Sequence, residues 1–426
     1  MNHGVHRMHR VTSGSPGTLL LATQAYVPDS AAVGQYMASV ATALAGRGWR
    51  VTVVTSQRGY NDPGLRLPSG INEGKVRIRR LWGLDSRKRH LGERLPGMIV
   101  FAVQAAVYAL CKPGLSGIVV STSPPVLPVL MMAVARLRRV PLIYWIMDLN
   151  PDQAIEAGQV SAAAWSARAL AAAQRWMFAR AAVGVVLDRF MAARVQRYHE
   201  SSAAMVATCP LWPLVSRSPS QSEVSRQFRQ RHRLDGHFVV MYSGNHSLVH
   251  PLDTVVEAAR RLRGDDRFKF VFVGSGAAKA AVAEAKRKEN LGHVILLPSQ
   301  PLDTLDGVLA AADVHLVSMG DKMVGCVHPS KVYGVLVVGR PLILLGPSPC
   351  HVTDLFERHD CGWRFPHGDV EGFVRLLRFL VSSAGEIELE KKRLAAARVF
   401  ADDEKTGGAR ACWLDTVEEA LRVNRG

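Results

Sequence analysis

The sequence lacks several features that would assign a class of protein at once. Its six cysteines, at positions 111, 209, 326, 350, 361 and 412, show no paired spacing, which argues against a zinc module or a redox dithiol and indicates reduced thiols. No Asp-x-Asp pair is present, so we expect no metal ion and no cofactor. The N-terminus has no apolar h-region, so we expect no signal peptide, and the basic-flanked apolar run Met98–Cys111 has 14 residues, too few to span a bilayer easily. We therefore expect a cytoplasmic protein.

Acidic residues are scarce in the first half of the chain. Residues 1–210 carry 24 Lys and Arg against 10 Asp and Glu, a balance of +14, whereas residues 211–426 have a balance of +3. The basic residues are scattered and lack interleaved aromatic residues or a recognised motif, so we expect no nucleic-acid partner. Arg87, Lys88 and Arg89 precede the run 98–111, and Lys112 follows it. This pattern fits either peripheral contact with an anionic membrane, at the inner face of the cell membrane, or a helix packed on its own sheet.

A chain of 426 residues is too long for one typical core, so two domains are expected. Apolar strands alternate with helical stretches, which predicts βαβ units and parallel sheets. Turn and linker residues cluster between positions 209 and 225. We predict an α/β chain with a flexible tail (1–17), two Rossmann-like domains (18–209 and 210–400) and a C-terminal helix (401–426) that crosses back to the first domain. The predicted strands are Thr18–Thr23, Arg50–Thr55, Gly117–Ser121, Val140–Ile146, Ala182–Leu187, Phe238–Tyr242, Phe268–Val273, His293–Leu297, Val314–Ser318 and Pro341–Leu345.

Residues 324–346 contain the most informative local pattern. His328, Ser330 and Lys331 lie in a polar loop that runs into a short helix, and the helix ends at Gly339 before an apolar strand. The free N–H groups at a helix start favour an anion, and a lysine adds positive charge, so the pattern predicts a phosphate-binding site. An ordinary helix-to-strand connection with a solvated Lys331 is the alternative.

Two further glycine turns follow predicted strands. Gly244, Asn245, His246 and His250 follow the strand that ends at Tyr242, and Gly274 and Gly276 follow the next strand. Because the carboxyl ends of parallel strands meet at one edge of a sheet, we expect these turns to converge with the Lys331 loop. Such a convergence suits a nucleotide diphosphate.

The first half offers two candidate residues for a second substrate. Asp148 ends a strongly apolar strand, where a carboxylate can orient or deprotonate an acceptor hydroxyl. Its alternative role is to cap the next helix, for which Asp152 competes. Gly34 lies in a loop of small residues before an alanine-rich helix, and simple packing is its alternative role.

Together these segments resemble the GT-B glycosyltransferases, and within them the bacterial family 4 retaining enzymes that build cell-surface polysaccharides on lipid carriers. The resemblance rests on residues 145–152, 242–246, 297–301, 311–313 and 328–331, and it spans roughly residues 18–420. It implies two Rossmann-like, doubly wound domains facing across a cleft. It also implies a nucleotide-sugar donor, expected to be a UDP-sugar, a lipid-linked or saccharide acceptor, and front-face substitution without a covalent intermediate.

The resemblance also assigns roles to particular residues. The implied catalytic residues are Asp148, His246 and Lys331, with Gly34 and Asp148 on the acceptor side. The implied donor-binding residues are Gly244, Asn245, His250, Gly274, Gly276, Gln300, His328, Pro329, Ser330 and Lys331.

The sequence departs from the family pattern at several of these positions. Many members have two Glu residues eight positions apart where this chain has Cys326 and Gly334, and Arg and Lys where it has Asn245 and His250. The cationic role then falls to Lys331, helped by His246 and His250. The Pro-Ser-Lys form is similar to a branch of N-acetylaminosugar transferases. A nucleotide-sugar epimerase and a non-catalytic nucleotide-sugar-binding scaffold are the alternative functions.

Overall fold

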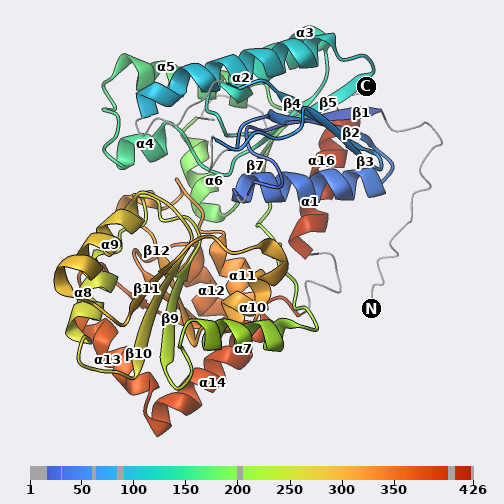
Figure 1. Cartoon of the computed structure of the whole chain (residues 1–426). Helices are drawn as coiled ribbons and strands as arrows, with labels where there is room; N and C mark the ends of the chain where they lie inside the picture. The colour runs from blue at the N-terminus through green and yellow to red at the C-terminus, as the bar shows by residue number, and fades with distance from the viewer. Residues whose placement is uncertain are drawn as a thin grey trace, which may run out of the picture. The chain divides into compact units, whose positions relative to one another are not determined.

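The computed structural model describes residues 17–29, 31–59, 64–83, 91–198, 205–401 and 408–423. The predicted tail up to residue 16, the 87–89 basic cluster and part of the predicted C-terminal segment lie outside these residues. By its internal contacts the chain divides into two compact units, Met1–Leu142 with Leu421–Gly426, and Ile143–Ala420. Helices and strands alternate along the chain (Figure 1). In order they are β1 Thr18–Ala22, α1 Ala32–Gly46, β2 Arg50–Ser56, β3 Gly70–Glu73, β4 Val76–Leu81, α2 Leu91–Cys111, β5 Leu115–Ser121, α3 Leu127–Arg138, β6 Leu142–Trp145, α4 Asp152–Glu156, α5 Trp165–Phe178, β7 Val183–Val186, α6 Arg189–Gln196, β8 Met205–Thr208, α7 Gln221–Arg231, β9 Phe238–Ser243, α8 Asp253–Arg261, β10 Phe268–Val273, α9 Ala278–Glu289, β11 Val294–Leu297, η1 Leu302–Thr304, α10 Leu305–Ala310, β12 Val314–Ser318, η2 Asp321–Met323, α11 Lys331–Val337, β13 Leu342–Leu345, α12 His351–His359, β14 Gly362–Phe365, α13 Val370–Leu380, α14 Ser383–Arg398 and α16 Gly408–Val423.

The first unit is built around parallel strands. β1 pairs in parallel with β2 and with β5, and β2 pairs in parallel with β4. All five residues of β1 are buried, as expected for a central strand covered on both faces. The antiparallel edge strand β3 and its neighbour β4 were not predicted. In β4 the buried face includes Arg80, whose guanidinium donates hydrogen bonds to the carbonyls of Val27 and Pro68, so a charged residue obscures the apolar alternation.

One helix of the first unit has apolar residues on its exposed side. In α2, the side chains of Phe101, Ala102 and Ala105 are buried, whereas Val103 and Val107 keep about half of their surface exposed. The exposed apolar residues recur at helical spacing, and they are Leu95, Ile99, Val103, Val107 and Leu110. Helix α2 therefore packs on the first unit through one face and exposes apolar residues on the other, and the contact with an anionic membrane remains a prediction. No helix in the described residues combines the length and apolarity needed to cross a bilayer.

The second unit begins with β6, β7 and β8, which pair in parallel. Three tryptophans connect this region with segments far along the chain. Trp145 of β6 stacks on Trp212 with ring centroids 6.0 Å apart, and the buried Trp413 of α16 lies 4.7 Å from Trp145. Helix α16 therefore packs against β6 through large aromatic side chains.

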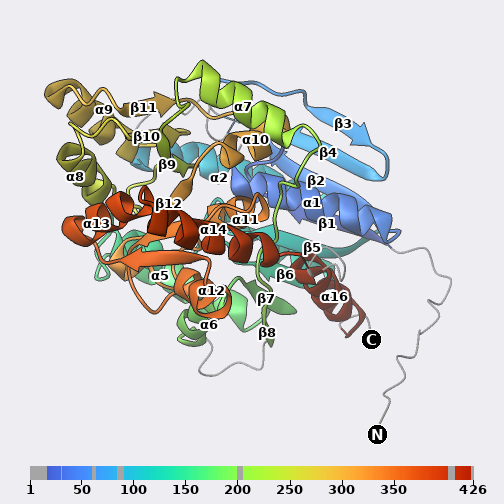
Figure 2. The same ribbon diagram turned by 90° about the horizontal axis from the view of Figure 1, so that it is seen from below.

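A six-stranded parallel sheet forms most of the second unit, in the order β11-β10-β9-β12-β13-β14. Successive residues of β9 face opposite sides, so Val240 and Tyr242 enter one core and Val239 and Met241 the other. Helices α8, α9, α13 and α14 cover the first side, and α7 and α10 cover the second (Figures 1 and 2). The chain thus has two Rossmann-like, parallel-sheet domains, as predicted.

Candidate functional site

The glycine turns meet at the carboxyl edge of the second sheet, as predicted. Strands β9 and β10 are adjacent and parallel, so the turns after Ser243 and Val273 start side by side. The Gly244 N–H donates to the Val273 carbonyl, and the Gly274 N–H donates to the Leu297 carbonyl at the end of β11. These hydrogen bonds continue the sheet ladder into the turns, which gives the turns a fixed backbone.

Glycine is required in these turns because the backbones approach each other closely. A Cβ atom at Gly274 would lie 2.1 Å from the Gly244 carbonyl oxygen, and Gly274 has a φ of +124°. A Cβ atom at Gly276, where φ is +137°, would lie 2.5 Å from the His246 carbonyl oxygen. Both the sterics and the left-handed backbone therefore exclude a side chain. Asn245 lies between these contacts and accepts a hydrogen bond from the Tyr242 hydroxyl through its backbone carbonyl.

Lys331 is half-buried, and its side chain ends in a buried Nζ beside these turns. Its Nζ lies 3.5 Å from the centroid of the Tyr242 ring, and a Cβ atom on Gly244 would lie 3.7 Å from the same Nζ. Within the described part of the chain, Nζ has no hydrogen-bond partner. Burial lowers the pKa of Lys331 to about 7, because the surrounding protein replaces the water that would stabilise the ammonium. The ring face offers the ammonium partial compensation.

Two histidines share this environment and are neutral at neutral pH. Burial, reinforced by the charge of Lys331, lowers the pKa of His246 to about 4 and that of His250 to about 3. Among the described residues, His246 Nε2 and His250 Nδ1 are buried without a hydrogen-bond partner. In the unliganded protein these imidazoles therefore carry no positive charge, which changes the cationic role expected from the sequence. His246 Nδ1 lies 3.4 Å from the Ser275 carbonyl oxygen, so His246 can donate to an anion through Nε2 only if its single proton moves to that nitrogen.

The N-terminus of α11 differs in two details from the predicted phosphate-binding site. Helix α11 has only seven residues, and the Ser330 side chain does not cap it. The helix ends close to the predicted position, with Gly339 at a φ of +71°. The site therefore depends on the Lys331 side chain more than on the helix dipole.

His328 is held by side chains on both sides rather than facing a ligand. Its Nδ1 lies 2.7 Å from Asp188 Oδ2 and its Nε2 lies 2.7 Å from the Tyr333 hydroxyl, and the three side chains are buried or nearly so. Burial acts to raise the pKa of Asp188, but the hydrogen bond and charge of His328 outweigh it and lower the pKa to about 2. Asp188 also accepts the Met191 N–H as the N-cap of α6. The donor-binding role expected for His328 remains a prediction.

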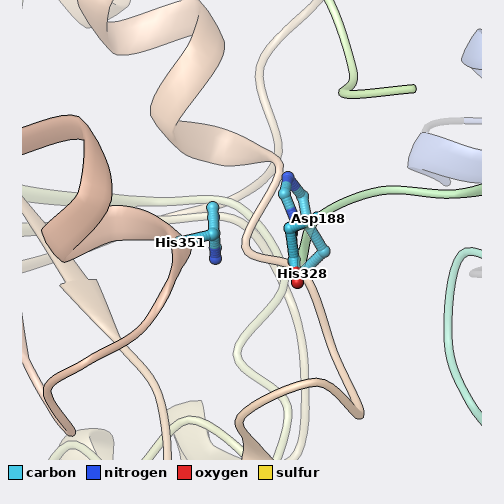
Figure 3. A group of neighbouring side chains, drawn as sticks. All are labelled: Asp188, His328 and His351. Atoms are coloured by element: carbon cyan, nitrogen blue, oxygen red, sulfur yellow. The ribbon is translucent and has the colours of Figure 1, made fainter. Parts of the chain in front are cut away.

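The ring of His351 stacks on the ring of His328 (Figure 3). The ring centroids are 3.8 Å apart and the planes differ by 25°. Asp188, His328 and His351 offer ligand atoms that lie within 4.8 Å of one another. A metal binds imidazole in the plane of the ring, and nearly parallel stacked rings do not direct their lone pairs at one point, so one ring would have to turn to hold an ion. In the present arrangement the cluster fixes the loop that leads to Lys331.

Asp148 lies in the turn after β6, as expected, and burial raises its pKa to about 6. The helix cap proposed as its alternative role is absent, because α4 starts at Asp152 with Pro151 as its N-cap. Asp152 instead accepts a hydrogen bond from the Tyr198 hydroxyl. The next residue, Leu149, donates its N–H to the Cys326 carbonyl at 2.9 Å, which links the Asp148 turn to the loop leading to Lys331.

Cys326 and Gly334, the two positions where the sequence resemblance leads to an expectation of glutamates, both lie in packed surroundings. Cys326 is fully buried, and burial raises the pKa of its thiol to about 12, so it supplies no negative charge. A Cβ atom at Gly334 would lie 3.3 Å from the Leu309 side chain. The negative charges of Asp152 and Glu156 on α4 act on the Cys326 thiol, and these two residues form ion pairs with Arg194 at 3.6 and 3.2 Å. Arg194 also donates to the Val324 carbonyl and so holds the loop from outside.

Three predicted residues lie elsewhere or have backbone roles. Gln300 is half-buried after the edge strand β11 and donates to the Pro298 carbonyl, with β10 between its strand and β9. Pro329 is buried, and its carbonyl accepts the Val332 N–H. In the first unit, a Cβ atom at Gly34 would lie 2.9 Å from Tyr26 Cα, so this glycine is needed for close packing of the loop on α1. Its acceptor role remains a prediction.

Comparison with known proteins adds independent information. Residues 31–212 match the family described as "Glycosyl transferase 4-like domain". WcaI of Escherichia coli K12, named as a colanic acid biosynthesis glycosyl transferase, is 29% identical over 158 residues. That alignment spans 37% of this chain and 39% of WcaI.

Solved structures match almost the entire chain. The sucrose-phosphate synthase of Thermosynechococcus elongatus superposes with a TM-score of 0.69 at 17% identity, covering 95% of this chain and 98% of that one. Anabaena HepE, solved in complex with UDP-glucose, superposes with a TM-score of 0.66 at 13% identity, covering 95% and 99%. The chain therefore has the GT-B fold and contains a segment similar to the glycosyltransferase 4-like domain.

Proposed function

We propose that the protein transfers a glycosyl group from a nucleoside-diphosphate sugar, with UDP as the nucleotide, to a lipid-linked or saccharide acceptor. The observation that carries this proposal is that Lys331 Nζ, His246 Nε2 and His250 Nδ1 belong to one cluster of side chains. The Lys331 ammonium and the His246 ring both contact the Tyr242 ring, and the charge of Lys331 acts on both histidines. These three nitrogens are buried and lack hydrogen-bond partners in the described part of the chain. Buried polar groups are rarely left unpaired, so a ligand rich in acceptor oxygens is the simplest completion of the site.

A diphosphate fits this site on chemical grounds. Its negative charge would raise the pKa of Lys331 and stabilise the ammonium, which can donate hydrogen bonds to the oxygens. Each imidazole would also donate one hydrogen bond to an oxygen once its proton lies on the nitrogen that lacks a partner. As the bond to the sugar breaks, negative charge grows on the leaving diphosphate, and a buried ammonium stabilises that charge more strongly than an exposed one. The position at the carboxyl edge of β9 and β12 is where open α/β sheets bind ligands.

In the same reaction, we assign Asp148 to the binding of the acceptor substrate. With a pKa of about 6, its carboxyl group is mostly ionised at neutral pH and can accept the hydrogen bond of a sugar hydroxyl. In the proposed reaction it orients the attacking hydroxyl, and substitution proceeds from the same face with retention of configuration and without a covalent enzyme intermediate.

The proposed acceptor is carried by the membrane, in the synthesis of a bacterial surface polysaccharide. The name of WcaI supports this context. The outward apolar residues of α2 support it from the structure, because a basic group lies at the end of that helix. Arg50 lies on β2, and Arg77 and Arg79 lie on the adjacent strand β4. Partial burial, reinforced by the charges of these three arginines, lowers the pKa of Lys112, which directly follows α2. An apolar stripe beside clustered cations suits an anionic lipid surface.

A labelling experiment tests the proposed function. The purified protein is incubated with UDP-sugars radiolabelled in the sugar and with bacterial membranes, and the products are separated by extraction and chromatography. We expect label in a lipid or saccharide product, and turnover about 100-fold lower for Lys331→Ala, the scale of losing one stabilising group. Conversion of the donor to an epimer would identify an epimerase instead, and binding without conversion would identify a non-catalytic scaffold.

A further inference from the structure

Two thiols from distant parts of the chain lie in contact. Cys209 Sγ and Cys412 Sγ are 3.2 Å apart, although the residues are separated by 203 positions in sequence. A disulfide requires the two sulfurs to approach to about 2 Å, so a shift of about 1 Å, within reach of side-chain rotation, would join them. Both cysteines are free thiols in the structure.

Neighbouring hydrogen bonds and packing contacts keep the thiols of Cys209 and Cys412 next to each other. Cys209 directly follows β8, and its N–H donates to the Val186 carbonyl of the neighbouring strand at 2.9 Å. Cys412 lies on α16, next to the buried Trp413 that packs against Trp145. Thr416, one turn further along α16, places its hydroxyl 3.6 Å from Cys209 Sγ. The contact between the sulfurs is therefore supported by the packing of a strand end and a helix.

The two thiols differ in accessibility in a way that sets an order of reaction. Cys412 is exposed, whereas Cys209 is buried. Burial raises the pKa of Cys209 to about 12, which keeps it protonated and unreactive toward reagents in solution. An oxidant must therefore react first at Cys412, after which Cys209 is the adjacent thiol that can complete the bond.

We propose that Cys209 and Cys412 are an oxidative cross-linking site, at which a low-molecular-weight disulfide joins α16 covalently to the end of β8. The Cys412 thiolate attacks one sulfur of the small disulfide, whose S–S bond breaks and releases one thiolate. Cys209 then loses its proton and attacks Cys412 Sγ, which releases the second thiol. Two protein thiols are oxidised, and the small disulfide is reduced to two thiols.

Oxidised glutathione is the probe that tests this proposal. The full-length protein is incubated with it, remaining thiols are alkylated, and the digest is analysed by mass spectrometry without reduction. We expect a peptide pair linked through Cys209 and Cys412 that disappears on reduction. The exposed Cys111 serves as the internal control, and we expect it to carry glutathione without forming the linked pair.

Two variants keep the test independent of folding. Cys412→Ser changes an exposed side chain, so it should fold normally and lose the linked peptide. Cys209→Ser should leave glutathione stably attached at Cys412, since no thiol displaces it. The proposal is overturned if wild-type protein keeps glutathione on Cys412 without cross-linking, or if the cross-links join separate molecules. Because Cys209 must be deprotonated, the second step should also accelerate with rising pH, and a rate independent of pH would contradict the assigned order.

Discussion

Replacing Lys331 with methionine should stabilise the unliganded protein, in a pH-dependent way. Methionine keeps the length of the side chain and its contact with the Tyr242 ring, but it removes the buried ammonium. The pKa of Lys331 falls from 10.5 to about 7 on folding. A difference of about 3.5 units corresponds to about 5 kcal/mol, which is the upper limit of the destabilisation that the charged lysine causes.

The sign of the pH dependence follows from the lowered pKa. Between pH about 7 and about 10.5, the unfolded chain binds a proton at this lysine that the folded chain does not, so the free energy of unfolding rises with pH in this window. The full cost is present below pH about 7. Lys331→Met should therefore be most stabilising at pH about 6 and lose its advantage as the pH approaches 10.5.

Urea denaturation at several pH values measures this effect. The buffers should contain no phosphate, because an anion in the site would stabilise the charged lysine. Lys288→Met is the matched control, since Lys288 is exposed and pairs with Glu284 on the surface of α9, and its change in stability should be small throughout. A stability difference between wild type and Lys331→Met that is the same at pH about 6 and about 10 would refute the buried, unpaired ammonium.

Three further predictions concern the surroundings of the site and the first unit. Asp188→Asn should destabilise the protein by about 2 kcal/mol at neutral pH. Because the pKa of Asp188 is lowered to about 2 in the folded protein, this loss of stability should vanish as the pH falls from about 4 to about 2. Urea denaturation of wild type and variant at neutral pH and in acid measures the difference. Gly274→Ala should lower the free energy of unfolding by about 3 kcal/mol or more, whereas Gly264→Ala, whose new Cβ meets open space, should change it little. Thermal melting distinguishes the two variants, and equal losses of stability would contradict the close approach of Gly274 to Gly244. Replacing Val103 and Val107 with serine, or Arg77, Arg79 and Lys112 with glutamine, should reduce co-sedimentation with anionic vesicles, and the second set should also reduce its salt sensitivity. Ile387→Ser, an exposed apolar position on α14, should leave sedimentation unchanged, and an equal loss for all three would argue against a specific membrane face.

The parallel sheets and the convergence of the glycine turns could be predicted from the sequence because the signals are local. Uninterrupted apolar runs such as Phe238–Tyr242 mark buried strands, and parallel strands place their carboxyl ends at one edge. β4 was missed because Arg80 occupies a core position that an apolar residue would normally mark. β14, which contains Arg364, offers only four residues with little pattern.

The supporting contacts of the site could not be predicted, because they join residues far apart in sequence. Asp188 and His328 are 140 positions apart, and nothing in their spacing indicates a hydrogen bond. The position of Asp188 after the apolar strand β7 and at the start of α6 was the available signal, but it identifies a helix cap rather than a partner for His328. The burial of His246 and His250 also could not be predicted from the sequence. Their neutral state at neutral pH therefore became evident only from the structure.

The central claim is that Lys331, His246 and His250 bind the diphosphate of the donor, and calorimetric titration with UDP tests it most directly. At pH about 8, Lys331 is mostly neutral in the free protein and should become charged on binding, so UDP binding should take up nearly one proton. The uptake is measured from the dependence of the binding enthalpy on the ionisation enthalpy of the buffer. We predict this uptake for wild type, and for Lys331→Met no uptake with affinity reduced about 10- to 100-fold, the scale of one charge-assisted hydrogen bond. UDP binding without proton uptake, or with equal affinity in the variant, would contradict the claim.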